Sequence, residues 1–230
     1  MNFIITPLLS LTLLSPAIAQ APVAIENEPR HQLAFQNECV RLFYVRIPPD
    51  DTTLFHIHEH DNVGVKLTDA ELSDVQPGRN PEKVLVNHGA VGFGHYPTPL
   101  IHSVSNVGST PYHNMLVEIL PSEDLPSSAP PLAHGAGRTL EMENESVRIF
   151  RLVLAPGQSA DEHAHALPGM GVVITEGKIA VDLPGAKSDI VMFKPGDYQW
   201  HNGGMRNSLR NVGSATFEAV EIELKHCALR

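Results

Sequence analysis

An internal duplication constrains the fold more than any other feature of this sequence. The segment 37–46, NECVRLFYVR, aligns with 144–153, NESVRIFRLV, at an offset of 107 residues. The same offset holds without a gap as far as the Pro-Gly pairs at 77–78 and 184–185. Self-similarity at a fixed spacing indicates a structural unit that occurs more than once. The sequence therefore predicts two similar domains rather than one large core of 230 residues.

The limits of the two domains follow from composition. We expect domain 1 over residues 37–120 and domain 2 over residues 139–225. The intervening residues 121–138 are rich in Pro, Ser, Gly and Ala, which is typical of a linker. Residues 20–36 precede the repeat and are expected to form an N-terminal arm.

Within each copy, the apolar residues predict short strands. They alternate with polar residues or form β-branched runs, as at 63–67, 172–175 and 219–222. Pro-Gly dipeptides such as those at 156–157 and 195–196 mark turns between them. No stretch holds a helical period over three turns. Short strands at regular spacing predict an all-β sandwich or barrel in each domain.

Charge and composition exclude several function classes. The chain has 16 Lys and Arg against 26 Asp and Glu, a formal net charge of -10. Nucleic-acid binding requires a concentrated basic surface, so no nucleic-acid partner is expected. No phosphate-binding loop is present either. Beyond the N-terminus no run is apolar enough to span a bilayer, and no stable membrane insertion is expected in the mature protein.

The N-terminus predicts export. An apolar stretch runs to Leu14, and the small-x-small triplet 17–19 follows it. This pattern is typical of a signal peptide, residues 1–19, with cleavage after Ala19 and a periplasmic or secreted product. The n-region lacks Lys and Arg, and the alternative is an uncleaved anchor or a buried strand. Cys39 and Cys227 could form a bridge in an oxidising compartment, but buried free thiols are also common, so their state stays open.

A His-x-His pair recurs at equivalent places in the two copies, as His56/His58 and His163/His165. Alternate residues of a strand point to the same face, so the two imidazoles of a pair can converge on one ion. Imidazole is a good ligand for transition metals, and His102 is expected on a neighbouring strand. The sequence predicts a metal site of His56, His58 and His102 in domain 1. The alternative for such pairs is a packing or surface role.

The second copy differs at the third position. Asn207 stands where domain 1 has His102, and an amide is a weak ligand. His163, His165 and Asn207 are therefore expected to form a lapsed or modified site. His201 could replace the missing histidine, but a loop position is the preferred interpretation.

Residues beside the two pairs carry less chemistry. His60 shares the parity of the first pair, but its counterpart is Leu167, which favours a position at the barrel mouth. Glu59 and Glu162 have the opposite parity and are expected to face away from the ligands. No catalytic base is assigned.

These motifs resemble those of the cupin family, specifically of two-domain cupins, over nearly the whole mature chain. The His-x-His pairs match the first cupin motif, His102-x-x-x-Asn106 matches the second, and 195–197 resembles the turn that precedes it. The resemblance implies tandem double-stranded β-helix, or jelly-roll, barrels that hold one divalent transition metal and a small-molecule ligand or substrate. It also allows a homo-oligomer, because such barrels often pair edge to edge.

The glutamate of the first motif is missing. It should stand near Val63 in domain 1 and Met170 in domain 2. Its loss argues against an oxalate-decarboxylase-like site but not against the three-histidine sites of thiol and diketone dioxygenases. We expect an exported bicupin whose metal is Fe, Mn, Cu, Zn or Ni, with ferrous iron less convenient after export. We expect it to act as a small-molecule oxygenase or decarboxylase. The alternatives are a non-catalytic protein that binds or senses a metal or small ligand, and a structural bicupin with relic histidines.

Overall fold

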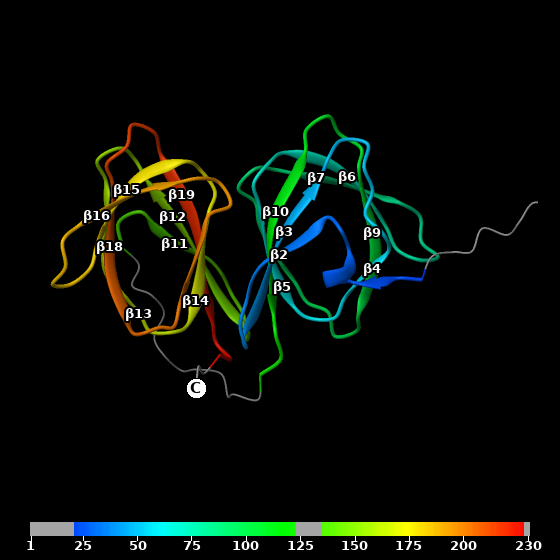
Figure 1. Cartoon of the computed structure of the whole chain (residues 1–230), viewed down its shortest axis with the longest axis horizontal. Coiled ribbons are helices and arrows are strands. Elements are labelled where there is room, and N and C mark those ends of the chain that lie inside the picture. Colours follow the sequence, from blue (N-terminus) through cyan, green and yellow to red (C-terminus); the bar gives the residue numbers. More distant parts are fainter. Residues whose placement is uncertain (1–20, 123–134, 228–230) are drawn as a thin grey trace, which may run out of the picture.

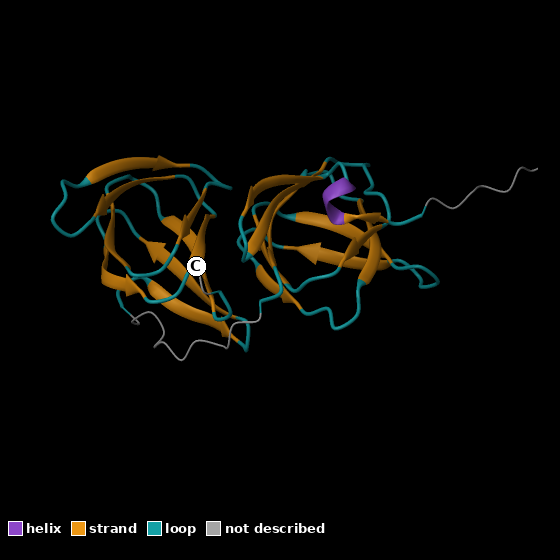
Figure 2. Ribbon diagram, turned by 60° about the horizontal axis from the view of Figure 1, so that its bottom comes forward, coloured by secondary structure: helices purple, strands orange, loops and turns teal. Residues whose placement is uncertain are grey.

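The computed structural model describes residues 21–122 and 135–227, which form two β-barrels side by side (Figure 1). Within these residues the helical element is one short 3-10 turn, η1 (Ile25–Asn27) (Figure 2). No helix in this described part of the chain is long and apolar enough to cross a membrane. The predicted signal peptide, 1–19, lies outside the described residues, as does most of the predicted linker. The predicted all-β tandem barrel fold is confirmed.

Barrel 1 consists of two facing sheets of five strands. The first has the order β1 (Val23–Ala24), β4 (His56–His58), β9 (Leu100–Asn106), β6 (Ala70–Val75) and β7 (Glu82–Val86). The second has the order β2 (His31–Gln36), β3 (Val40–Ile47), β10 (Tyr112–Ile119), β5 (Asn62–Lys66) and β8 (Val91–Gly94). Crossing between sheets in this way closes a jelly-roll barrel.

Barrel 2 repeats this arrangement. One sheet has the order β11 (Arg138–Glu143), β12 (Val147–Leu154), β19 (Phe217–Leu224), β14 (Gly169–Val173) and β17 (Tyr198–His201). The other has the order β13 (Ser159–His165), β18 (Met205–Asn211), β15 (Gly177–Asp182) and β16 (Asp189–Phe193). Each strand of this barrel has a counterpart in barrel 1.

The expected N-terminal arm is part of barrel 1. Strand β1 pairs with β4, and β2 pairs with β3. The register of β2 shifts between Leu33 and Phe35, and that of β11 shifts between Leu140 and Met142, 107 residues later. Strand β11 itself begins at Arg138, the last residue of the predicted linker. The structural repeat therefore begins earlier than the sequence alignment indicates.

Three apolar clusters hold the described chain together. One fills barrel 1 and one fills barrel 2. The third lies between the barrels and draws side chains from both. In β3, Leu42 faces the cluster between the barrels and Phe43 faces the interior of barrel 1. A strand that is buried on both faces has a continuous run of apolar residues in the sequence, as at 63–65.

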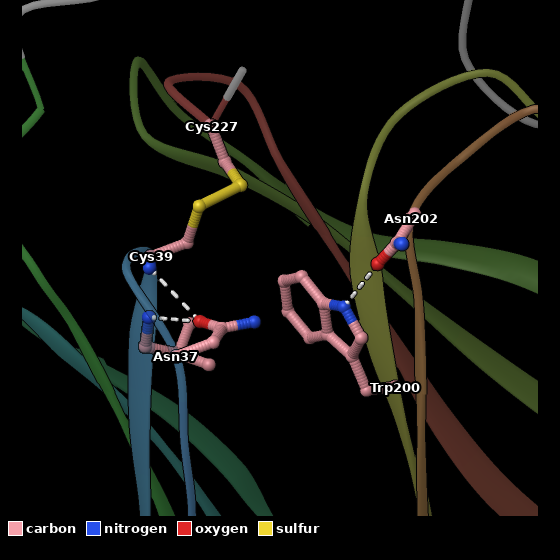
Figure 3. Close-up of a disulfide and its surroundings, with 6 residues drawn as sticks. Asn37, Cys39, Trp200, Asn202 and Cys227 are labelled. Carbon is pink, nitrogen blue, oxygen red and sulfur yellow. Dashed lines mark hydrogen bonds between the residues drawn. A yellow bond between two sulfur atoms is a disulfide. The ribbon is translucent and has the colours of Figure 1, made fainter. Parts of the chain in front are cut away.

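A disulfide joins the segment before β3 to the segment after β19. Cys39, which directly precedes β3, is bonded to Cys227 (Figure 3). The Asn37 side chain accepts hydrogen bonds from the backbone N–H groups of Cys39 and Val40, each at 2.9 Å, and so fixes the turn before β3. Trp200 of barrel 2 lies nearby and stacks on Phe35 of barrel 1. The bond therefore closes the contact between the two barrels.

The asparagine of the second motif has a structural role in both barrels. Asn106 Nδ2 donates to the carbonyls of Ile47 and Thr110, and its Oδ1 accepts from the N–H of Gly108. Asn211 makes the same three contacts in barrel 2. The side chain satisfies buried backbone groups, so its recurrence reflects the fold.

Candidate metal centre

Four histidines meet inside barrel 1. His56 and His58 lie on β4, His102 faces His56 directly on β9, and His31 comes from β2 on the opposite sheet. The Nε2 atoms of His56 and His58 are 3.1 Å apart, and so are those of His58 and His102. His56 and His58 are buried. The structure thus brings together the three histidines expected in domain 1.

In three of these four imidazole rings, Nδ1 lies within hydrogen-bond distance of an oxygen acceptor, which fixes the orientation of the ring. His56 Nδ1 donates to the Leu54 carbonyl at 2.9 Å. His102 Nδ1 lies 2.9 Å from Asp74 Oδ2, and His31 Nδ1 lies 2.8 Å from Glu28 Oε2. A carboxylate or carbonyl at Nδ1 fixes the tautomer and directs the Nε2 lone pair away from it. The rings are therefore oriented as metal ligands are.

The spacing of the Nε2 atoms fits a transition metal. Burial lowers the pKa of His56 to about 4 and that of His58 to about 2, so both rings are neutral near pH 7. A neutral ring whose Nδ1 carries the proton, as in His56, directs its Nε2 lone pair into the cluster, whereas Nδ1 of His58 has no hydrogen-bond partner. Nitrogen ligands at about 2.1 Å from a metal are about 3.0 Å apart at right angles and about 3.4 Å apart in a tetrahedron. The observed 3.1 Å falls in this range.

His31 is the member of the cluster that the sequence did not reveal. The ligand atoms of His31, His56 and His58 lie within 4.8 Å of one another. His31 lies in the expected arm, and its counterpart at an offset of 107 is an arginine, so comparison of the copies gave no signal. The relation between His31 and residue 138 is indicated by the bulge that recurs in β2 and β11, which is a feature of the structure and not of the sequence.

The strand residues near Val63, where the glutamate of the first motif is missing, face two different sides. Val63 and Met170 belong to the apolar cluster between the barrels. Asn62, which precedes Val63, is buried and lines the barrel 1 cavity. Since neighbouring strand residues face opposite sides, Asn62 is the one that faces the histidines, and an amide is a weak ligand.

The cavity around the histidines is small and polar on one side. Its volume is about 210 Å³, and Lys66, Tyr96 and Asn114 line it together with the cluster. Lys66 Nζ donates to Asn114 Oδ1 at 3.1 Å. Burial raises the pKa of Tyr96, whose side chain hydrogen-bonds with that of Asn62. The cavity thus offers one cation and one neutral phenol beside the four imidazoles.

The residues that flank the His-x-His pairs do not face the cavity. Glu59 and Glu162 are exposed, and Glu162 pairs with Arg206 at the surface. His60 is half-buried in a bend after β4 and does not line the cavity. None of them supplies a catalytic base.

Barrel 2 gathers a different set of side chains. His163 Nε2 and His165 Nε2 are 2.9 Å apart, and Asn207 Nδ2 lies 3.5 Å from His165 Nε2. His201 is not a loop residue as we expected: it lies on β17, is buried, and its ring centre is 4.2 Å from that of His165. Burial lowers the pKa of His201 to about 4.

Two charged residues complete this second cluster. Glu221 Oε1 lies 2.6 Å from His165 Nδ1, and Arg138 Nη2 donates to His163 Nε2 at 3.0 Å. The ligand atoms of His163, His165 and Glu221 lie within 4.8 Å of one another, a spacing that by itself would suit a metal. The sequence gave no signal for either charged residue. Barrel 2 therefore differs from barrel 1 by a buried guanidinium beside its histidines.

Comparisons with known proteins give likenesses in structure. No protein-family model matches the sequence, and no curated protein matches it. AerE from Microcystis aeruginosa is 15% identical with a TM-score of 0.55, covering 86% of this chain and 98% of its own. A variant of Bacillus subtilis oxalate decarboxylase is 11% identical with a TM-score of 0.55, covering 84% and 71%. A cupin domain protein from Bordetella pertussis Tohama I is 25% identical, with a TM-score of 0.36 over 38% of this chain and 91% of its own.

Proposed function

The chain is a two-domain cupin by its fold, and from that premise we propose that barrel 1 binds one divalent transition metal through His56, His58 and His102 and acts on a small molecule. The observation that supports this most is the position of His58 Nε2, which lies 3.1 Å from Nε2 of His56 and 3.1 Å from Nε2 of His102. His31 stands beside them as a further donor. The identity of the metal is left open among Fe, Mn, Cu, Zn and Ni.

A bound metal with vacant positions would act as a Lewis acid or bind dioxygen. The other residues of the cavity would bind the substrate, hold a proton and orient a ligand. Lys66 presents a cation to an anionic group of the substrate, and Tyr96 holds a proton near His58. Asp74 keeps the Nδ1 proton of His102 in place. These roles suit an oxygenase or decarboxylase for small oxygen-rich molecules; the alternative is a barrel that binds a metal and ligand without turnover.

Export of the protein is part of this proposal. Disulfides form and persist in oxidising compartments, and the bond between Cys39 and Cys227 supports a periplasmic or secreted location. The signal pattern at 1–19 agrees with it. A homo-oligomer stays a prediction.

Turnover distinguishes an enzyme from a binding protein. The mature protein, loaded separately with each of the five metals, is mixed with short carboxylates, 1,3-diketones and thiols while oxygen uptake and carbon dioxide release are recorded. Metal-free protein is the control. Metal-dependent uptake or release supports the enzyme. Saturable ligand binding without either favours the binding protein, and failure to retain any metal would overturn the proposal.

Asp74→Asn is expected to weaken metal binding by about 10-fold to 100-fold, because the carboxylate that orients His102 and raises its basicity is lost. Affinity is measured by competition with a chromogenic chelator. Asp69→Asn is the matched control, since Asp69 accepts a backbone hydrogen bond at the surface and does not line the cavity. Equal affinity in both variants would show that Asp74 has no part in the site.

A further inference from the structure

Arg138 in barrel 2 occupies the position that His31 occupies in barrel 1. Each residue is the first of its strand, and each strand pairs with the next along the chain in the same register: His31 faces Val45, and Arg138 faces Leu152. The exchange of an imidazole for a guanidinium therefore falls inside the two clusters. It changes the charge at the centre of barrel 2.

The contacts of Arg138 show what this charge does. Its side chain is 2% exposed, and Nη2 donates to Nε2 of His163. His163 Nδ1 already donates to the Asp161 carbonyl, so the last lone pair of this ring is used. Glu221 Oε2 lies 3.4 Å from Arg138 Nε and balances its charge. A divalent ion would meet a fixed positive charge and one imidazole fewer.

Barrel 2 nonetheless has the larger cavity, about 280 Å³ against about 210 Å³ in barrel 1. Apart from the polar cluster, Tyr198 and Gln199, its walls are apolar, and partly exposed Leu183 lies among them. The apolar wall residues include Leu152, Val173, Val181, Phe193, Leu209 and Phe217. Such walls suit the hydrocarbon part of a ligand.

The polar end of this cavity holds buried atoms without partners. Both ring nitrogens of His201 and Oδ1 of Asn207 have no hydrogen-bond partner, although these residues are 7% and 8% exposed. The Glu221 Oε1 atom lies 3.9 Å from His201 Nε2, which is too long for a hydrogen bond. A buried polar group without a partner indicates a water, an ion or a ligand. Neutral His201 offers one donor and one acceptor, and Asn207 Oδ1 requires a donor. A hydroxyl group, which donates one hydrogen bond and accepts others, would satisfy Asn207 Oδ1 and the ring N–H of His201.

We propose that barrel 2 is a metal-free pocket in which the Arg138 guanidinium replaces the ion, and that it binds a small apolar alcohol or phenol. The hydroxyl group donates to Asn207 and accepts from His201. An uncharged ligand follows from the pairing of Arg138 with Glu221, which leaves the polar end without net charge. A carboxylate would meet Glu221, and an amine would meet Arg138.

Calorimetric titration of the mature, metal-loaded protein tests the ligand class. The probes are phenol and cyclohexanol, with benzoate and benzylamine as charged analogues of similar size. We expect one saturable site per chain for the neutral probes, at least tenfold tighter than for the charged ones. Tighter binding of benzoate or benzylamine, or no saturable binding of any probe, would overturn the proposal.

Substitutions locate the site. Asn207→Leu is expected to weaken phenol binding about tenfold through loss of the acceptor. Arg206→Ala is the control on the same strand, because Arg206 is exposed and pairs with Glu162 at the surface. Phenol binding that survives Asn207→Leu unchanged would place the probe elsewhere. His56→Ala should remove metal without changing phenol affinity, so failure of the barrel 1 proposal is seen separately.

Metal content tests the role of Arg138. We expect no metal in barrel 2 of the wild type, so His163→Ala leaves the metal content unchanged. The double variant Arg138→His, Asn207→His recreates the histidines of barrel 1 and should add one metal per chain. Loss of metal in His163→Ala would show that the guanidinium does not replace an ion. Circular dichroism confirms that each variant is folded.

Discussion

His56→Ala is expected to lower the affinity of barrel 1 for a divalent metal by at least about a thousandfold. Loss of a residue that only orients a ligand costs about 10-fold to 100-fold, and loss of a ligand itself costs more. His56 is fully buried, and its ring is fixed by Leu54 and lies between His31 and His102.

Elemental analysis after dialysis against a weak chelator measures this effect. His60→Ala is the matched control, since His60 is close in sequence, is half-buried and does not line the cavity. The control should retain the metal content of the wild type. Metal retained by His56→Ala, or lost equally from both variants, would mean that the ion is held somewhere other than barrel 1.

The duplication was sufficient to predict the fold because the residues that match between the copies stabilise the same turns and strands. Asn37 and Asn144 cap the same turn, and Asn106 and Asn211 satisfy the same backbone groups. Because the same hydrogen bonds are needed in both barrels, the same residue type occurs at both positions. Such residues align the copies and place the His-x-His pairs on equivalent strands.

The parts of the site that were missed are those where the barrels differ. His31 aligns with Arg138, and His201 aligns with Gly94, so comparison of the copies gave no signal for His31 and did not support the candidate His201. In barrel 1 the Tyr96 ring lies where a side chain on Gly94 would go. A neighbour two residues along thus fills the space that His201 fills in barrel 2.

The sequence placed the missing glutamate only approximately, near Val63 and Met170, for a different reason. The face on which a strand residue lies depends on how many loop residues separate it from the previous strand, and periodicity within a strand does not fix that number. Residues 59–61 lie between β4 and β5 and place Asn62 toward the cavity. The pairing of Cys39 with Cys227 likewise depends on the contact between the barrels, which no local pattern records.

Removal of the disulfide is expected to lower the free energy of unfolding by about 2–5 kcal/mol. The bond closes a loop with a sequence separation of 188, which constrains the unfolded chain strongly. The test is the double variant Cys39→Ser, Cys227→Ser, unfolded in urea. Trp200 is the single tryptophan and stacks on Phe35 across the barrels at 5.8 Å, so its fluorescence reports their separation.

Reductant provides the control for this prediction. Wild-type protein in reductant should match the variant, and the variant should not respond to reductant. Because each barrel has its own apolar cluster, Trp200 should change before the barrels themselves unfold, while metal stays bound to barrel 1. Equal midpoints with and without the bond would show that the apolar cluster between the barrels holds them together by itself. In that case the bond would have no measurable effect on stability. Its formation alone would then support the proposal that the protein is exported.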